Sequence, residues 1–219
     1  ATAVFNYRLA DIKRENPALE EITLNSSPYG KSFYLHLGFV PVSEEQEIDG
    51  IRFTPMKYIV RKIIREINRD DIPECAGVIR EAFMTVANEF GFTAQNASGF
   101  TAFSMCTEKL RRQYEKEHRP MYAYFNAGKI VGYYSLELLE NQECELNNLA
   151  VLPSYRHQGI GEKLLSHSLE EARKMNCKIM KIGIVEENKI LRKWYEAHGF
   201  VHTGTEKFDF FPFTCGYMK

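Results

Sequence analysis

Apolar positions change their spacing along the chain between every second residue and every third or fourth, which predicts alternating strands and helices. Strands are predicted at residues 62–67, 121–125, 130–139, 145–152, 179–185, 201–205 and 215–218. Helices are predicted from a cap at Asp70-Asp71 through Phe90, then at residues 107–117, 160–175 and through Tyr195. A polar connection at residues 91–104 and a turn at 126–128 complete the order. The order predicts a mixed α/β sheet with helices on both sides.

Composition and charge narrow the functional classes. With 219 residues and 44% hydrophobic residues, the chain can bury a substantial core. A net charge of −1 gives no overall field toward nucleic acid or an anionic membrane, so neither is an expected partner. The five cysteines are odd in number and form no C-x-x-C pair, which argues against a disulfide framework and favours a reducing cytoplasm. No apolar run approaches the ~20 residues of a membrane span, and no cleavable signal sequence is visible.

The most distinctive motif is Arg-x-x-Gly-x-Gly at residues 156–161, between a predicted strand and an amphipathic helix. Gly159 and Gly161 remove Cβ atoms that would keep an anion from the backbone, and the first N–H groups of the helix point toward it. Arg156 can add charge and a fork of donors. No Lys-Ser/Thr pair follows and no third glycine completes a dinucleotide fingerprint, so ATP and NAD are not expected.

This motif resembles the signature of the GNAT superfamily of N-acetyltransferases, in which the loop holds the pyrophosphate of acetyl-CoA. Asn188, Tyr195 and Gly199-Phe200 follow strand 179–185 in the family's order. The resemblance implies a GNAT-like acyl-CoA N-acyltransferase fold, acetyl-CoA as co-substrate, and two strands that splay beside the loop to receive pantetheine. The cofactor-binding residues that it implies are Leu149, Ala150, Val151, Arg156, His157, Gln158, Gly159, Ile160, Gly161 and Asn188.

An internal repeat sets the expected domain plan. Residues 33–40 (FYLHLGFV) read like residues 194–201 (WYEAHGFV), about one domain length later. Asp49-Gly50, which is flanked by Glu47-Ile48 and Ile51-Arg52, predicts a type I′ hairpin. Residues 1–58 are therefore interpreted as the C-terminal half of a GNAT-like domain, and residues 59–219 as a complete GNAT acetyltransferase domain. The half-domain lacks the phosphate loop, so we expect it to be structural, burying apolar strand faces against the complete domain or a second chain in a homodimer.

Acetyl transfer to an amine benefits from a base, because a lysine-like amine is almost entirely protonated near neutral pH. Strict strand alternation puts Glu145 on the same side as Asn147, Leu149 and Val151. In GNAT proteins that resemble histone acetyltransferases, a Glu at this distance before the loop is the general base. A solvated carboxylate with a water relay is the alternative, and Glu186-Glu187 could serve as base or bind a cationic acceptor.

The resemblance also gives Tyr195 the role of acid for the departing CoA thiolate, and Asn188 a hydrogen bond to the pantetheine region. Packing within its helix is the alternative for Tyr195, since Tyr34 recurs in the half-domain. Cys144 adjoins Glu145, so an acyl-cysteine route competes with direct transfer. His198 and His202 straddle a helix-to-strand break, which does not suit two ligands of one metal, and no metal is predicted.

The leading hypothesis is an acetyl-CoA-dependent N-acetyltransferase that acetylates a primary amine in a ternary complex. A non-catalytic acyl-CoA sensor or scaffold is the alternative, and a plain phosphate or nucleotide binder would leave Asn188 and Tyr195 unexplained. The acceptor stays open among small amines, amino acids, aminoglycosides, peptides and protein N-termini. The stretch with Phe90, Phe92 and Phe100 is expected to form one wall of its site, or to be packed.

Overall fold

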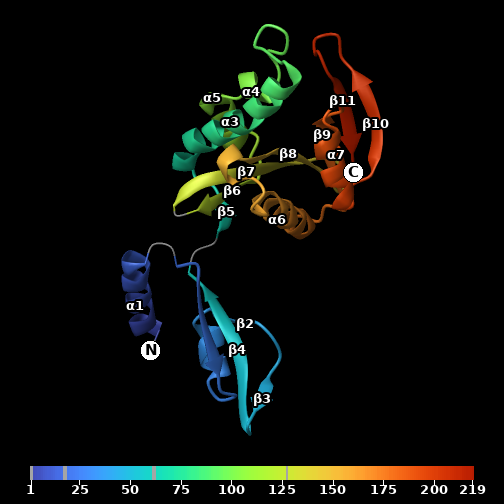
Figure 1. Cartoon of the computed structure of the whole chain (residues 1–219). Helices are drawn as coiled ribbons and strands as arrows, with labels where there is room; N and C mark the ends of the chain where they lie inside the picture. Colours follow the sequence, from blue (N-terminus) through green and yellow to red (C-terminus); the bar gives the residue numbers. More distant parts are fainter. Residues whose placement is uncertain (1, 17–18, 61–62, 127) are drawn as a thin grey trace. The chain divides into compact units, whose positions relative to one another are not determined.

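The chain forms two compact units, Ala1–Ile63 and Ile64–Lys219 (Figure 1). The computed structural model describes residues 2–16, 19–60, 63–126 and 128–219. The first unit contains α1 (Thr2–Glu15), β1 (Glu21–Ser26), α2 (Lys31–His36), β2 (Val40–Pro41), β3 (Gln46–Ile48) and β4 (Ile51–Ile59). Each unit has its own sheet, and the two are described separately.

The sheet of the first unit is built around β4. This long strand pairs antiparallel with the whole of β1, with β2, and with β3 through a tight hairpin. Asp49 and Gly50 both have positive φ (52° and 77°), as a type I′ turn requires, so the predicted hairpin is confirmed. The rings of Phe5, Phe39 and Tyr58 lie within 5.7 Å of one another and form an aromatic core.

The second unit contains the Arg-x-x-Gly-x-Gly loop at residues 156–161 and the strands and helices around it. Its elements are β5 (Ile64–Glu66), η1 (Arg69–Asp71), α3 (Ile72–Phe90), α4 (Thr101–Ser104), α5 (Thr107–Glu115), β6 (Met121–Asn126), β7 (Lys129–Leu138), β8 (Glu143–Val151), η2 (Pro153–Tyr155), α6 (Ile160–Lys174), β9 (Ile179–Val185), α7 (Lys189–Ala197), β10 (His202–Lys207) and β11 (Thr214–Met218). They form a seven-stranded sheet in the order β10-β11-β9-β8-β7-β6-β5. Among the described strands of this sheet, only β8 and β9 pair in parallel, with α6 as their crossover, so the predicted mixed sheet is confirmed.

The repeat in the sequence corresponds to a repeat in topology. The order β1-β4-β2 in the first unit matches the order β9-β11-β10 in the second, with α2 and α7 in equivalent places along the chain. In the second unit β9 continues the sheet to β8, whereas β1 pairs only with β4 in the described residues. The first unit therefore has the topology of the C-terminal half of the second.

Helices α3 and α6 cover opposite faces of the seven-stranded sheet (Figure 1). On β7, Gly132 and Tyr134 face α6: a Cβ on Gly132 would lie 2.8 Å from the Leu164 side chain, and the Tyr134 hydroxyl lies 2.6 Å from His167 Nδ1. The intervening Tyr133 faces the other way and is fully buried. The central strand is thus buried on both faces, which confirms the predicted helices on both sides.

Two details differ from the prediction. The connection at residues 91–104 contains a short helix, α4, whose Ala102 is buried with the aromatic rings of Phe92 and Phe100. Strand β5, the first strand of the second unit, begins at Ile64, whereas the predicted strand began at Lys62. Lys62, and Ala127 in the predicted turn, lie outside the described residues. No helix in the described ranges is long and apolar enough to cross a membrane.

Candidate functional site

Strands β8 and β9 are paired over only part of their length, and they separate in the middle of the sheet. Both strands are fully described, and their parallel ladder ends at the pair Glu145–Lys181, although they continue to Val151 and Val185. The N–H of Leu152 donates to Val131 O on β7 (2.9 Å), so by alternation the main-chain groups of Val151 point away from β7 toward the gap. The predicted splay is therefore present, with backbone groups directed into it.

A β-bulge lies in β8 beside this gap. Tyr133 pairs with Ala150 and Ser135 with Asn147, so β8 contains one residue more than β7 over this interval. Asn148 takes up the difference with a φ of 54°, which asparagine tolerates better than most residues. The bulge interrupts the alternation of side chains along the strand.

The bulge makes the sequence-based placement of Glu145 wrong in one respect. Glu145 and Asn147 face the α3 side of the sheet, whereas Val151 pairs with Gly132 and faces the α6 side. Strict alternation had put Glu145 and Val151 on one side. The side chains of Glu145 and Val151 on β8 therefore point to opposite faces of the sheet.

The loop at residues 156–161 ends in an uncapped helix N-terminus. Gly159 is the N-cap of α6 in the left-handed conformation (φ 75°, ψ 4°), and no side chain caps the helix. The first backbone bond of the helix runs from Lys163 N–H to Gly159 O, so the N–H groups of the three residues between them have no helical acceptor. A Cβ built on Gly159 meets no atom within 4 Å. An anion can therefore approach these N–H groups closely.

The second glycine borders α7. A Cβ on Gly161 would lie 3.8 Å from the Trp194 ring and 4.0 Å from Val151, which are ordinary contacts. In the same loop His157 has a positive φ of 61°, and the Gln158 amide donates to Ser154 O (3.3 Å). The loop, the end of β8 and α7 thus lie together around the start of α6.

Arg156 binds protein groups in this structure. Its guanidinium donates to Val151 O (3.2 Å) on β8 and to Thr85 Oγ1 and Ala82 O (both 2.9 Å) on α3. These bonds join the loop to a helix on the far side of the sheet. A direct contact between Arg156 and an anion stays a prediction, whereas its role in fixing the loop follows from the contacts.

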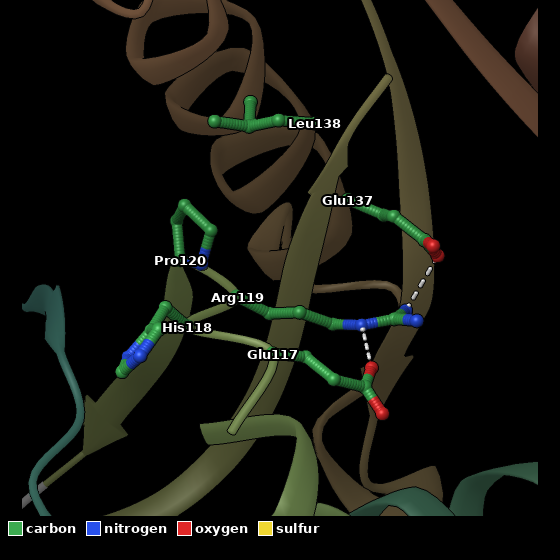
Figure 2. Close-up of a pocket in the computed structure, with 6 residues that line it drawn as sticks. All are labelled: Glu117, His118, Arg119, Pro120, Glu137 and Leu138. Carbon is green, nitrogen blue, oxygen red and sulfur yellow. Dashed lines mark hydrogen bonds and ion pairs between the residues drawn. The ribbon is translucent and has the colours of Figure 1, made fainter. Parts of the chain in front are cut away.

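Glu145 lies in an environment that favours its protonated form. Partial burial, and then the neighbouring carboxylate of Glu137, raise the pKa of Glu145, and the cations Arg119 and Lys181 only partly oppose them. Arg119 extends between the carboxylates of Glu137 and Glu117 (Figure 2). These three residues line a cavity of about 390 Å3 at the end of β7. Sequence reasoning missed both Arg119 and Glu137, since the strand register that aligns Glu137 with Glu145 carries no local signal.

Asn188 and Tyr195 stand at the start and near the end of α7. Asn188 Oδ1 accepts from Leu191 N–H (3.0 Å) as an N-cap, which leaves its amide NH₂ without another partner among the described residues. The Tyr195 side chain is buried against Trp194 and Phe200. Burial raises the pKa of Tyr195, so the phenol is protonated at neutral pH.

Glu186 and Glu187, the alternative candidates for the base, are both hydrogen-bonded to other protein groups. Glu186 is hydrogen-bonded to Lys189, Arg192 and His202, and these bonds outweigh its burial and lower its pKa. Glu187 accepts from Thr214 N–H at 3.0 Å and 3.2 Å. Glu186 therefore joins the end of β9 to α7 and β10, and Glu187 joins it to the start of β11, so both carboxylates are poorly available to an acceptor.

Cys144 is poorly suited to act as a nucleophile, and His198 and His202 each contact a protein group. Cys144 is fully buried, and burial raises the pKa of its thiol to about 12. His198 Nδ1 contacts Trp194 O (2.8 Å), and His202 is bonded to Glu186. In the part of the chain that the structure describes, no group of three or more His, Cys, Asp and Glu side chains could hold a metal ion.

Aromatic side chains join the α3–α4 segment to the loop before β11. The ring of Phe213 lies 4.9 Å from that of Phe92 and 5.6 Å from that of Phe100. Phe92 and Phe100 are buried in this cluster, so packing accounts for both residues. The expected acceptor wall of phenylalanines is thus, at these two positions, part of a core that also includes Val185 at the end of β9.

Known proteins resemble both units. The model of the acetyltransferase (GNAT) family matches residues 88–200, and that of an acetyltransferase (GNAT) domain matches residues 1–60. The uncharacterized N-acetyltransferase YjgM of Escherichia coli K12 is 29% identical over 143 residues, which cover 64% of this chain and 82% of that protein.

Solved structures share the fold at low sequence identity. The ribosomal-protein-alanine N-acetyltransferase of Brucella melitensis has a TM-score of 0.57 at 22% identity, over 72% of this chain and 98% of that one. The PaiA N-acetyltransferase of Thermoplasma acidophilum, in complex with coenzyme A, has a TM-score of 0.58 at 17% identity, over 70% and 96%.

Proposed function

Because this chain belongs to the GNAT acetyltransferase family and is an acyltransferase, we propose that it transfers an acetyl group from acetyl-CoA directly to a primary amine in a ternary complex. The observation that carries the proposal is the gap between β8 and β9 beside the uncapped start of α6. An extended thioester with a diphosphate at its far end fits this combination. Bound acetyl-CoA supplies the activated acyl group.

Different residues around the gap bind different parts of acetyl-CoA. The N–H groups that follow Gly159 hold the diphosphate, with the positive end of the α6 dipole behind them. The N–H of Val151 faces the gap, where it can bond the pantetheine arm. The free amide NH₂ of Asn188 donates to the same arm from α7. Arg156 keeps the loop in place through α3 and β8.

Glu145 acts as the base for the amine. Its carboxylate lies on the α3 face, at the point where the β8–β9 ladder ends. The pKa of Glu145 is raised toward neutral pH by partial burial and by Glu137, which makes its carboxylate a stronger base than that of an ordinary glutamate. Since Glu186 and Glu187 are bound to neighbouring groups, Glu145 is the better placed of the three.

Tyr195 acts as the acid for the departing thiolate. Burial keeps its phenol protonated, so a proton is available when the carbon–sulfur bond breaks. Tyr195 lies on the same short helix as Asn188, which binds the arm that ends in the thiol. Direct transfer is favoured over an acyl-cysteine route because the Cys144 thiol is buried and protonated.

The test measures binding and turnover separately. Calorimetry with desulfo-CoA measures occupation of the gap, and thiol release from acetyl-CoA across a panel of primary amines measures transfer. We expect binding by wild type, Glu145→Gln and Tyr195→Phe, with thiol release strongly reduced in the two variants. Absence of desulfo-CoA binding would overturn the proposal. Binding without thiol release for any amine would instead indicate an acyl-CoA sensor.

A further inference from the structure

Two carboxylates stand side by side on the α3 face of the sheet. Glu137 on β7 is the direct cross-strand partner of Glu145 on β8. Directly opposed like charges in an antiparallel pair are destabilising. Asn147, two pairs further along and on the same face, donates its amide to Glu137 Oε2 (3.4 Å), which contributes a neutral hydrogen bond but no charge. The pair therefore depends on a nearby cation.

Arg119 supplies that cation from the segment before β6. Its Nη1 lies 2.7 Å from Glu137 Oε2, and its Nε lies 2.7 Å from Glu117 Oε2. The Arg119 side chain is only 16% exposed, so both ion pairs are partly shielded from water. Figure 2 shows the guanidinium between the two carboxylates. Arg119 is thus held in one place and directed toward the Glu137 side of the pair.

The other charged groups that influence Glu145 lie on the strands beyond the gap. Lys181 on β9 is the register partner of Glu145, and its ammonium is 2.5 Å from Glu143 Oε2. Tyr217 on β11 is neutral, because burial and a hydrogen bond to Glu206 raise its pKa. Lys181 is therefore largely committed to another carboxylate. Arg119, through Glu137, is the charge that most directly determines the surroundings of Glu145 on the β7 side.

We propose that Arg119 is a positioning residue for Glu145: it fixes and neutralises Glu137, so that Glu145 works as a base over a lower pH range than the bare carboxylate pair would allow. The proposal rests on the base role of Glu145 given above. Arg119 touches neither substrate in this scheme. It acts through its ion pair with Glu137, the carboxylate that faces the base, and through its own positive charge near Glu145.

The sign of each substitution follows from the charges. Arg119→Met removes the cation, leaves Glu137 unneutralised and raises the pKa of Glu145, so the acidic limb of kcat/KM moves to higher pH by about one unit. Glu137→Gln removes the like charge, so the limb moves to lower pH. The double variant returns toward the wild-type profile, because the group that Arg119 neutralises is then absent. Arg119→Lys keeps the positive charge, though not the guanidinium that bridges Glu117 and Glu137, and is expected to give a profile close to that of wild type.

The experiment records kcat/KM against pH for thiol release by the full-length chain, with one amine throughout so that the amine's own titration is common to all curves. Arg69→Met is the matched control, since it removes an exposed arginine that pairs with Glu115 (3.0 Å). We expect opposite shifts for Arg119→Met and Glu137→Gln, and none for the control. Unshifted limbs in both folded variants would refute the proposal. If Arg119→Met does not fold, Arg119→Gln replaces it, because glutamine keeps a polar donor for Glu137 but carries no charge, and the same shift to higher pH is expected.

Failure of the proposed function gives a different result. If Glu145→Gln keeps both its rate and its acidic limb, Glu145 is not the base and the function must be revised. If Glu145→Gln abolishes the limb while Arg119→Met and Glu137→Gln leave it in place, the base role stands and only the positioning role of Arg119 is wrong.

Discussion

Replacement of Gly159 by alanine separates the needs of the fold from those of the ligand. Gly159 has a left-handed backbone (φ 75°), and nothing lies within 4 Å of the position that a Cβ would occupy. The added methyl group therefore meets no protein atom. It enters the open space at the N-cap of α6, next to the helix start where the diphosphate is proposed to bind.

The cost to stability is the backbone strain alone. A non-glycine residue in the left-handed region costs about 1–2 kcal/mol, and reduced freedom of the unfolded chain offsets about 0.4–1 kcal/mol of that cost. The net loss is about 1 kcal/mol, which for a unit of this size corresponds to a drop in Tm of about 2–4 °C. The loss of affinity should be larger, at least about tenfold in Kd, or about 1.4 kcal/mol.

Gly161→Ala is the matched control in the same loop. Gly161 lies inside the first turn of α6, and its Cβ would make only ordinary contacts with Trp194 and Val151. Alanine there should be neutral or stabilising by up to about 1 kcal/mol, with desulfo-CoA affinity close to that of wild type. Thermal melts without ligand and calorimetry with desulfo-CoA measure the two quantities for both variants.

Two results would refute this reasoning. If Gly159→Ala binds desulfo-CoA with the wild-type Kd, the loop does not hold the diphosphate. If Gly161→Ala loses as much affinity as Gly159→Ala, the open space at Gly159 is not the determining feature, and the loop as a whole is merely sensitive to added volume.

Three further predictions follow from the site and the division into units. Tyr195→Phe should lower kcat at least about tenfold with little change in desulfo-CoA affinity, and an unchanged kcat would remove its role as acid. Arg156→Met removes three hydrogen bonds to β8 and α3, although Ala82 O keeps its bond from the Thr85 hydroxyl (2.7 Å), so it should cost about 1–3 kcal/mol in a denaturant melt; a loss of affinity without loss of stability would show that Arg156 contacts the ligand directly. Residues 64–219 alone should bind desulfo-CoA with the Kd of the full chain, since every proposed site residue lies in that unit, while a changed Tm or oligomeric state would report the structural role proposed for residues 1–58.

The sequence was informative where local rules act without competition. Strand β9 was predicted with its observed bounds, and the hairpin at Asp49-Gly50 followed from residues that tolerate positive φ. The positions of the loop and of α7 followed from two motifs in a fixed order. In each case the signal lies within a few neighbouring residues.

The remainder depends on contacts between distant segments. The bulge at Asn148 changes which face Glu145 occupies, and it arises from the register between β7 and β8. The guanidinium of Arg156 binds Thr85, and Arg119 binds Glu137, across sequence separations that no periodicity reveals. Asparagine before an apolar strand end is a weak sign of a bulge, but it does not specify the register.

The short β8–β9 ladder has a mechanical consequence. In the described residues the ladder between strands β5–β8 and strands β9–β11 consists of the pairs Glu143–Ile179, Cys144–Met180 and Glu145–Lys181, so the seven-stranded sheet is divided into two smaller blocks, which α6 and the aromatic cluster around Phe213 also connect. A molecule that bonds to both blocks completes the missing seam. If acetyl-CoA binds in the gap as proposed, it adds contacts between the two blocks, and we therefore expect it to stiffen the second unit.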